Sequence, residues 1–377
     1  MRMKATFSPF EPPRRTLMGP GPSNVSSRVL LAMARPTIGH LDPQFLQLMD
    51  AVAEQLRELF GTRNELTIPI SATGSAGMET AFVNVLEPGD CAIIGVHGVF
   101  GQRMTDVASR AGAHVVTVEA EWGKPLDVEQ LVQAHKKNPD ARLLAVVHAE
   151  TSTGVLQPLD DLGDYLRGTD TLFLVDAVTS LGGVPVKIDE RGVDVAYSGT
   201  QKCLSVPPGL SPVTLSERAV ERIRSRQTRV QSWYLDLSMI GSYWGSERVY
   251  HHTAPINAVY GLHEGLCAIL EEGLEARYER HRRLGGLLQS GLVDRGMELL
   301  VDEPYRLPQL TSVKVPDGVD EKELRCSLLE RFGIEIGGGL GPLAGAIWRI
   351  GLMGDTCREE NVVLFLSALD ELLGGRG

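Results

Sequence analysis

The sequence predicts an α/β fold: a mostly parallel sheet flanked by helices, followed by a smaller C-terminal α/β domain. Between residues 66 and 215, short apolar segments alternate with helix-like segments. Nearly continuous apolar strands in such an alternation are typical of a parallel sheet that is covered on both faces. The chain has 377 residues, of which 43% are hydrophobic, so it is too long for one typical small core.

Three segments follow from this composition. We expect an N-terminal arm at residues 1–18, a large domain at 19–272 and a small domain at 273–377. The arm contains Pro9, Pro12 and Pro13 and shows little periodicity. Residues 19–24 (GPGPSN) come next, and this much glycine and proline forces a sharply turning backbone.

The elements of the large domain are predicted in order. A helix begins with Asp42 as its N-cap and Pro43 at its first position, and it continues to about Phe60. Strands are then expected at 66–70, 91–96, 114–118, 143–147, 172–178, 193–197 and 211–215, and helices at 77–86, 102–111, 128–135 and 159–166. Residues 216–250 are expected to be irregular.

The C-terminal third begins with a predicted single amphipathic helix at residues 255–288. A compact α/β unit follows, with strands expected at 309–315, 334–336 and 346–350 and helices at 322–331 and 360–373. No internal repeat is visible in the sequence.

Charge and cysteine content exclude several functional classes. The net charge is −11 and no basic cluster contains interleaved aromatic residues, so nucleic acid and anionic membrane are poor partners. The five cysteines are far apart and include no CxxC pair, which argues against a zinc site or a disulfide framework. We expect reduced core thiols, no metal and a cytoplasmic protein, since no signal peptide or membrane-spanning segment is present in the sequence.

Two strand ends carry polar residues suited to a ligand. After the first strand, Thr73, Gly74 and Ser75 open a helix, and free N–H groups at such a position bind phosphate. The alternative is that Thr73 or Ser75 only caps the helix. Asp176 ends the apolar strand at 172–175, where a buried carboxylate needs a cation or hydrogen-bond donors. The ring nitrogen of a cofactor would serve, and so would a salt bridge or a helix cap.

Lys202 follows Asp176 by 26 positions, which is enough for a crossover to the next strand and places both residues at the same edge of the sheet. Alone, Lys202 would be interpreted as an ordinary solvated lysine. A phosphate cradle, an aspartate and a lysine amine together describe a pyridoxal-phosphate site, because that cofactor needs an anion site, a partner for its pyridine nitrogen and a Schiff-base lysine.

The chain resembles the class V, fold-type I aminotransferases, in particular the alanine–glyoxylate (serine–pyruvate) group. The resemblance runs nearly end to end, through segments at 17–24 (LMGPGPSN), 83–90 (VNVLEPGD), 150–155 (ETSTGV), 180–183 (SLGG), 198–202 (SGTQK), 250–253 (YHHT), 338–342 (GGLGP) and 348–351 (WRIG). It implies the fold of that family, with its seven-stranded type of sheet, and pyridoxal 5′-phosphate as the cofactor.

The resemblance also implies roles for single residues. Lys202 would form the Schiff base and carry the proton, and Asp176 would pair with the pyridine nitrogen. Val178 and Phe100 would cover the two faces of the ring, and Thr151 would bond near its 3-hydroxyl. Arg349 would bind the substrate carboxylate beside Gly21 and Thr151. The phosphate would be held by Thr73, Gly74, Ser75 and Gln201.

A homodimer is implied as well, because Tyr250 and Thr253 would reach the phosphate of the partner subunit. His251 and His252, between them, look like metal ligands, but a structural role is expected because nothing else clusters with them. Small amino acids and 2-oxo acids are the implied substrates.

Within the class, we expect transamination from alanine or serine to glyoxylate or pyruvate by a ping-pong mechanism. The first alternative is the (S)-ureidoglycine–glyoxylate aminotransferase of purine catabolism, in which we expect Asn at the position of Tyr250. A second is a cysteine desulfurase-type lyase. That group usually carries His before the lysine, where this chain has Gln201, and a reactive cysteine on a mobile loop. Cys326 and Cys357 lie in helix-like sequence or shortly after a glycine, rather than in an obvious exposed loop.

Overall fold

The central sheet contains seven strands in this structure, a computed structural model in which residues 9–374 are described. Their order across the sheet is β2 (Leu66–Ile70), β10 (Ser211–Leu215), β9 (Val195–Tyr197), β8 (Leu172–Asp176), β5 (Leu143–Val147), β3 (Cys91–Val96) and β4 (His114–Glu119). β10 is antiparallel to both neighbours, and the other pairs are parallel. The predicted mostly parallel sheet is therefore confirmed.

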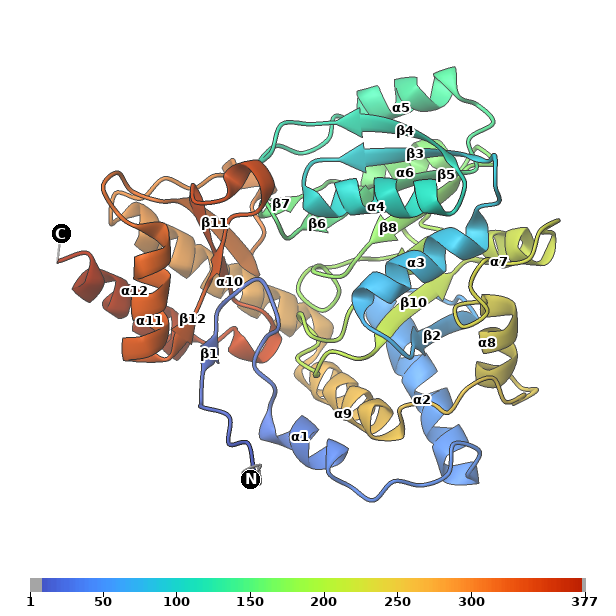
Figure 1. Ribbon diagram of the computed structural model, residues 1–377, viewed down its shortest axis with the longest axis horizontal. Coiled ribbons are helices and arrows are strands. Elements are labelled where there is room, and N and C mark those ends of the chain that lie inside the picture. Colours follow the sequence, from blue (N-terminus) through green and yellow to red (C-terminus); the bar gives the residue numbers. More distant parts are fainter. Residues whose placement is uncertain (1–8, 375–377) are drawn as a thin grey trace, which may run out of the picture.

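Helices cover the sheet on both sides, with α3 and α4 in front of it in Figure 1 and α6 behind. The helices of this part are α1 (Ser27–Met33), α2 (Pro43–Phe60), α3 (Gly74–Val85), α4 (Val99–Arg110), α5 (Val128–Lys137), α6 (Asp160–Leu166), α7 (Glu217–Arg224), α8 (Leu237–Trp244) and α9 (Ile256–Glu272). The prediction for α2 is confirmed, because Asp42 accepts a hydrogen bond from the Gln44 N–H at 2.8 Å.

Several predicted boundaries are wrong. α3 and α4 each begin three residues before the predicted start, and residues 216–250, predicted to be irregular, contain α7 and α8. β8 ends at Asp176 rather than at 178, because the Val178 N–H turns back to the Asp176 side chain. The single helix predicted at 255–288 is two helices, α9 and α10 (Leu274–Val293). Gly273, with a φ of 85°, interrupts them, a backbone angle that favours glycine.

The C-terminal unit lies on the left in Figure 1, and α10 leads into it. A three-stranded antiparallel sheet, β11 (Leu310–Lys314), β14 (Ile347–Gly351) and β13 (Gly337–Gly338), packs with α10, α11 (Glu321–Phe332) and α12 (Glu359–Leu372). The core of this unit includes Leu288, Trp348 and Phe365. Three 3₁₀ helices, at Glu303–Tyr305, Gly341–Leu343 and Gly354–Thr356, complete its elements.

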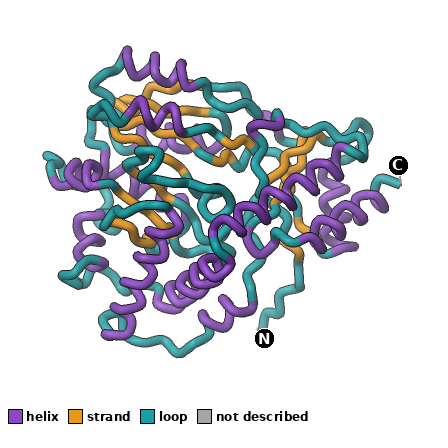
Figure 2. Tube along the Cα trace, turned by 180° about the vertical axis from the view of Figure 1, so that it is seen from behind, coloured by secondary structure: helices purple, strands orange, loops and turns teal. Residues whose placement is uncertain are grey.

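The N-terminal segment joins the two units. β1 (Thr16–Leu17) pairs in parallel with β12 (Ile334–Glu335), and Met18 is buried in the C-terminal core. The chain then crosses to the large sheet through residues 19–24. The first half of the predicted arm, residues 1–8, lies outside the described residues. Figure 2, seen from behind, shows this connection running as loop between the two groups of helices.

The cysteines are all free. Cys203 and Cys357 are buried and Cys91 and Cys267 are half-buried, but Cys326 is exposed, so the prediction of core thiols is wrong for Cys326. No helix in the described part of the chain is long and apolar enough to cross a membrane.

Candidate active site

The carboxyl ends of β8 and β9 bring Asp176 and Lys202 to one edge of the sheet. Asp176 is the last residue of β8 and pairs in register with Tyr197, the last residue of β9. Lys202 follows five residues later in a buried loop. This edge is where ligands bind in open α/β sheets.

Asp176 is buried and its carboxylate is fixed from two sides. The Val178 N–H donates to Oδ1 and the Tyr197 hydroxyl donates to Oδ2, both at 2.8 Å. Burial raises the pKa of Asp176 to about 6, opposed by the Val178 N–H, the Tyr197 hydroxyl and the positive charge of Lys202. The salt-bridge alternative is not supported, since Asp176 forms no ion pair within residues 9–374. Sequence reasoning missed Tyr197, whose only signal was its place at the end of the neighbouring strand.

Lys202 is held under the N-terminal segment. Its ammonium donates to the carbonyl oxygen of Pro20, and burial, followed by the positive charge of Arg349, lowers its pKa to about 8. Gly21 has a φ of 104°, and a Cβ there would lie 2.7–2.9 Å from Cδ, Nζ and Cε of Lys202. A glycine is therefore required where this segment crosses the lysine. The interpretation of Lys202 as an ordinary solvated lysine is wrong.

The N-terminus of α3 faces the same region. Thr73 is at the N-cap position but its side chain makes no capping hydrogen bond, so the cap alternative fails for Thr73, and Ser75 lies inside the helix. A Cβ at Gly74 would lie 3.4 Å from Val178 and 3.5 Å from Gly199, which places this helix start against the lysine loop. The buried Oε1 of Gln201, from the same loop, has no hydrogen-bond partner in the structure.

Phe100 lies half-buried in the first turn of α4, where its N–H donates to Oε2 of Glu150 at 3.3 Å. Arg103 is one turn later; its guanidinium lies 4.9 Å from the centre of the Phe100 ring and donates to Ser75 Oγ at 3.3 Å. Arg103 and Glu150 are further residues that sequence reasoning missed. Burial raises the pKa of Glu150 to about 7.

Arg349 is the buried cation of the site. It lies on β14, and its Nε and Nη1 donate to the carbonyl oxygens of Gly338 and Thr151 at 2.8 and 3.0 Å. No carboxylate of residues 9–374 forms an ion pair with it. Burial lowers its pKa to about 10. Three of its five N–H groups are left over, so it can take an anion. The Thr151 hydroxyl lies 2.5 Å from that of Thr179.

Tyr250 and Thr253 are not joined to this group by any hydrogen bond in the structure of residues 9–374. Tyr250 is exposed, and its hydroxyl lies 3.4 Å from that of Thr253. Between them, His251 and His252 are hydrogen-bonded to each other through Nδ1 at 2.8 Å, and His252 bonds to Ser71 at 2.7 Å. No group of metal-binding residues occurs within the described residues.

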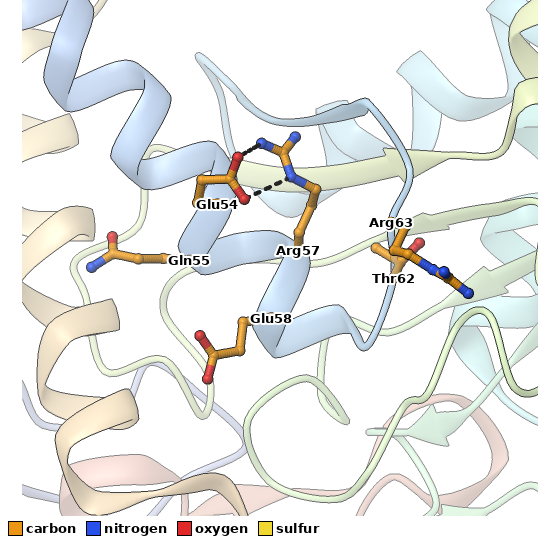
Figure 3. A pocket seen from close by; sticks show the side chains of 6 residues that line it. All are labelled: Glu54, Gln55, Arg57, Glu58, Thr62 and Arg63. Carbon is orange, nitrogen blue, oxygen red and sulfur yellow. Dashed lines mark hydrogen bonds and ion pairs between the residues drawn. The ribbon is translucent and has the colours of Figure 1, made fainter.

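A separate hollow of about 440 Å³ lies at the end of α2. Figure 3 shows Glu54 and Arg57 facing each other across one turn of α2 there, joined by two hydrogen bonds, with Arg63 pointing away. Glu54 and Arg57 are paired with each other, and Glu58 and Arg63 are exposed to solvent, so it offers no comparable chemistry.

Pyridoxal phosphate fits the residues at the sheet edge. The uncapped start of α3 suits its phosphate, and Asp176 is a fixed carboxylate for its ring nitrogen. Lys202 is a buried amine with a lowered pKa, as the carbonyl chemistry of this cofactor requires.

Comparison with known proteins places the chain in a family. It matches the aminotransferase class-V family over residues 24–359. It is 43% identical over 379 residues to the (S)-ureidoglycine–glyoxylate transaminase of Bacillus subtilis, over 96% of this chain and 91% of that protein. It is 42% identical to the alanine–glyoxylate aminotransferase of Callithrix jacchus, over 98% and 90%.

A solved structure agrees with these matches. The alanine–glyoxylate aminotransferase of Nostoc sp. superposes with a TM-score of 0.96 at 50% identity, and the match covers 98% of each chain. The site geometry and the match over most of the length lead to one conclusion: the protein belongs to the class-V aminotransferases, and its cofactor is pyridoxal phosphate.

Proposed function

We propose that this aminotransferase transfers the amino group of alanine or serine to glyoxylate or pyruvate by a ping-pong mechanism. The observation that carries the proposal is Arg349, a buried guanidinium whose hydrogen bonds within residues 9–374 go to carbonyl oxygens and whose charge lowers the pKa of Lys202. A substrate α-carboxylate would complete its hydrogen bonds in the bidentate geometry that guanidinium favours. The names of the Bacillus subtilis and Callithrix jacchus relatives both include glyoxylate.

The residues that would hold the cofactor surround Lys202. Asp176 would pair with the pyridine nitrogen, and Val178 and Phe100 would cover the faces of the ring. Thr151 would lie near its 3-hydroxyl. The phosphate would bind to Thr73, Gly74, Ser75 and Gln201. When bound, the cofactor supplies an electron-withdrawing ring that stabilises negative charge on the substrate carbon.

Lys202 would carry the proton. Its pKa of about 8 leaves part of the amine neutral near neutral pH, so Nζ can accept a proton from the substrate Cα and return it. Arg349 would fix the carboxylate and thereby orient the Cα–H bond toward Nζ. The close crossing of Gly21 over Lys202 would exclude water from this position.

The proposal includes a homodimer in which Tyr250 and Thr253 reach the partner's phosphate. Neither is hydrogen-bonded to the other site residues within residues 9–374, and large apolar side chains are exposed in or near their segment: Leu41, Trp233, Val249 and Tyr250. Ring contacts of His40 with Tyr250 and of Trp233 with His251 bring these segments together, and exposed apolar groups that gather in this way are characteristic of an interaction site.

A small neutral donor is favoured because Arg349 is the buried arginine of the site without an ion pair, whereas Arg103 bonds to Ser75 on the phosphate side. Ureidoglycine is the second candidate donor, supported by the 43% identity to the Bacillus subtilis enzyme. The lyase alternative finds no support: Cys326 lies on helix α11 and Cys357 is buried, so neither lies on an exposed loop.

The test is an absorbance titration of the purified holoenzyme with L-alanine, L-serine and ureidoglycine in turn, each followed by glyoxylate. Bleaching of the visible band by alanine or serine and its return with glyoxylate would support the proposal. A response to ureidoglycine alone would identify the second candidate, and a response to none of the donors would refute both.

A further inference from the structure

Ser205 has a backbone conformation that serine rarely adopts. Its φ is 53°, and of the three non-glycine residues with positive φ in residues 9–374, Ser205 is the buried one. It lies three residues after Lys202. Residues held in this region occur where the surroundings determine the backbone, often at functional sites.

The hydroxyl groups of Ser205 and Ser23 form a hydrogen-bonded chain, whose direction follows from the shorter bond of Ser23 to the Lys202 carbonyl. The Ser23 hydroxyl donates to the Lys202 carbonyl oxygen at 2.7 Å and lies 3.2 Å from Ser205 Oγ. The Asp355 N–H donates to Ser205 Oγ at 2.7 Å. Because Ser23 has one proton and uses it on Lys202, Ser205 must donate to Ser23. The order is therefore Asp355 N–H to Ser205, Ser205 to Ser23, and Ser23 to Lys202.

One end of this chain reaches the active-site lysine, and the other end reaches the segment that follows Arg349 in the sequence. At one end, residues 20–23 bind Lys202 twice: Pro20 accepts from its amine and Ser23 donates to its carbonyl. At the other end, Asp355 follows Arg349 by six residues. A Cβ at Gly354 would collide with Ser205 Oγ, so a glycine is needed for this approach. Bonds in such a chain polarise one another.

We propose that Ser205 is a positioning residue for Lys202, whose hydroxyl couples the segment after Arg349 to the backbone of the lysine. The substrate clamp and the lysine amine are then held in one relative position. The inference rests on the role proposed for Lys202 and is independent of which amino acid is the donor.

The test compares Ser205→Gly with wild type as the holoenzyme. Glycine keeps the positive φ and removes the CH2OH side chain with its hydroxyl, so the backbone of the loop is retained. We expect kcat to fall about 3- to 10-fold, the effect of one net hydrogen bond, with a smaller change in the KM of the donor. The pH midpoint of the visible band without substrate should rise, because a less confined Nζ of Lys202 moves away from the positive charge of Arg349.

Two further variants make the result specific. Lys187→Gly, at an exposed residue with a φ of 50°, controls for release of backbone strain and should leave the midpoint and kcat unchanged. Ser23→Ala breaks the same chain at the next link. The double variant with Ser205→Gly should therefore show little more effect than either single variant. If Ser205→Gly folds poorly, Ser23→Ala alone still tests the chain, because it should lower kcat and raise the midpoint in the same way.

If Ser205→Gly has the same kcat and the same pH midpoint of its visible band as wild type, the inference is overturned while the proposed function stays intact. Fully additive effects of the two serine variants would also overturn it. A wild-type protein that shows no visible band with added pyridoxal phosphate would instead refute the role of Lys202, on which the inference depends.

Discussion

Replacement of Arg349 tests the substrate clamp most directly. Two of its N–H groups bond to the Gly338 and Thr151 carbonyls, and three remain for a carboxylate. Hydrogen bonds to a charged group contribute about 1.5–3 kcal/mol each, and part of this energy is recovered by solvation of the substrate. Arg349→Ala should therefore lose about 2–4 kcal/mol, which is roughly 30- to 1000-fold in kcat/KM.

Most of this loss should be in the KM of the amino acid, because the carboxylate is bound in both the ground state and the transition state. Steady-state kinetics with alanine and glyoxylate measure it. Arg349→Lys keeps the charge but not the planar, two-pronged guanidinium, so its KM for the amino acid should lie between those of wild type and Arg349→Ala. Arg325→Ala, which removes a neighbouring arginine paired with Glu321, is the matched control. An unchanged KM in a folded Arg349→Ala would show that the carboxylate binds elsewhere.

Four other outcomes are expected. Lys202→Ala should abolish transamination and the visible band, while retained turnover would contradict its role. Gly21→Ala should reduce kcat at least about 10-fold, since its Cβ would displace Lys202, whereas Gly286→Ala on α10, where a Cβ meets open space, should stabilise the fold by about 1 kcal/mol. Tyr197→Phe removes a donor that lowers the pKa of Asp176, so Asp176 should become protonated earlier as the pH is lowered. The affinity of the apoenzyme for pyridoxal phosphate should then begin to fall at a higher pH than in wild type, and an unshifted pH profile would exclude this link. Burial lowers the pKa of His97 to about 4, so the unfolded chain binds more protons there between pH 6.5 and 4 and stability falls on acidification. The free energy of unfolding, measured in urea at pH 7 and at pH 4.5, should fall less in His97→Leu than in wild type. An equal fall in both proteins would refute the reasoning.

The order of elements was predictable because apolar periodicity responds to local burial. The strands of the large sheet and α2 were found where the alternation and the cap at Asp42 indicated them. Boundaries were less predictable. The starts of α3 and α4 depend on contacts from distant segments, Ser198–Gly199 for Gly74 and Glu150 for Phe100. From the sequence alone, a glycine that ends a helix, as Gly273 does between α9 and α10, could not be distinguished from a glycine tolerated inside a helix.

The sequence by itself determined the fold class and the family, because these depend on residue types and their spacing. The roles of the single site residues, the cytoplasmic location and the homodimer, also inferred from the sequence, stay predictions. The tertiary structure alone decided which groups meet. It placed Tyr197 on Asp176, Pro20 over Lys202, and Arg349 among carbonyl oxygens without a carboxylate. It also revealed the chain from Asp355 through Ser205 and Ser23 to Lys202. The bonded residues are 21 to 198 residues apart in the sequence, and hydrogen bonds between them depend on positions in space that no local pattern records.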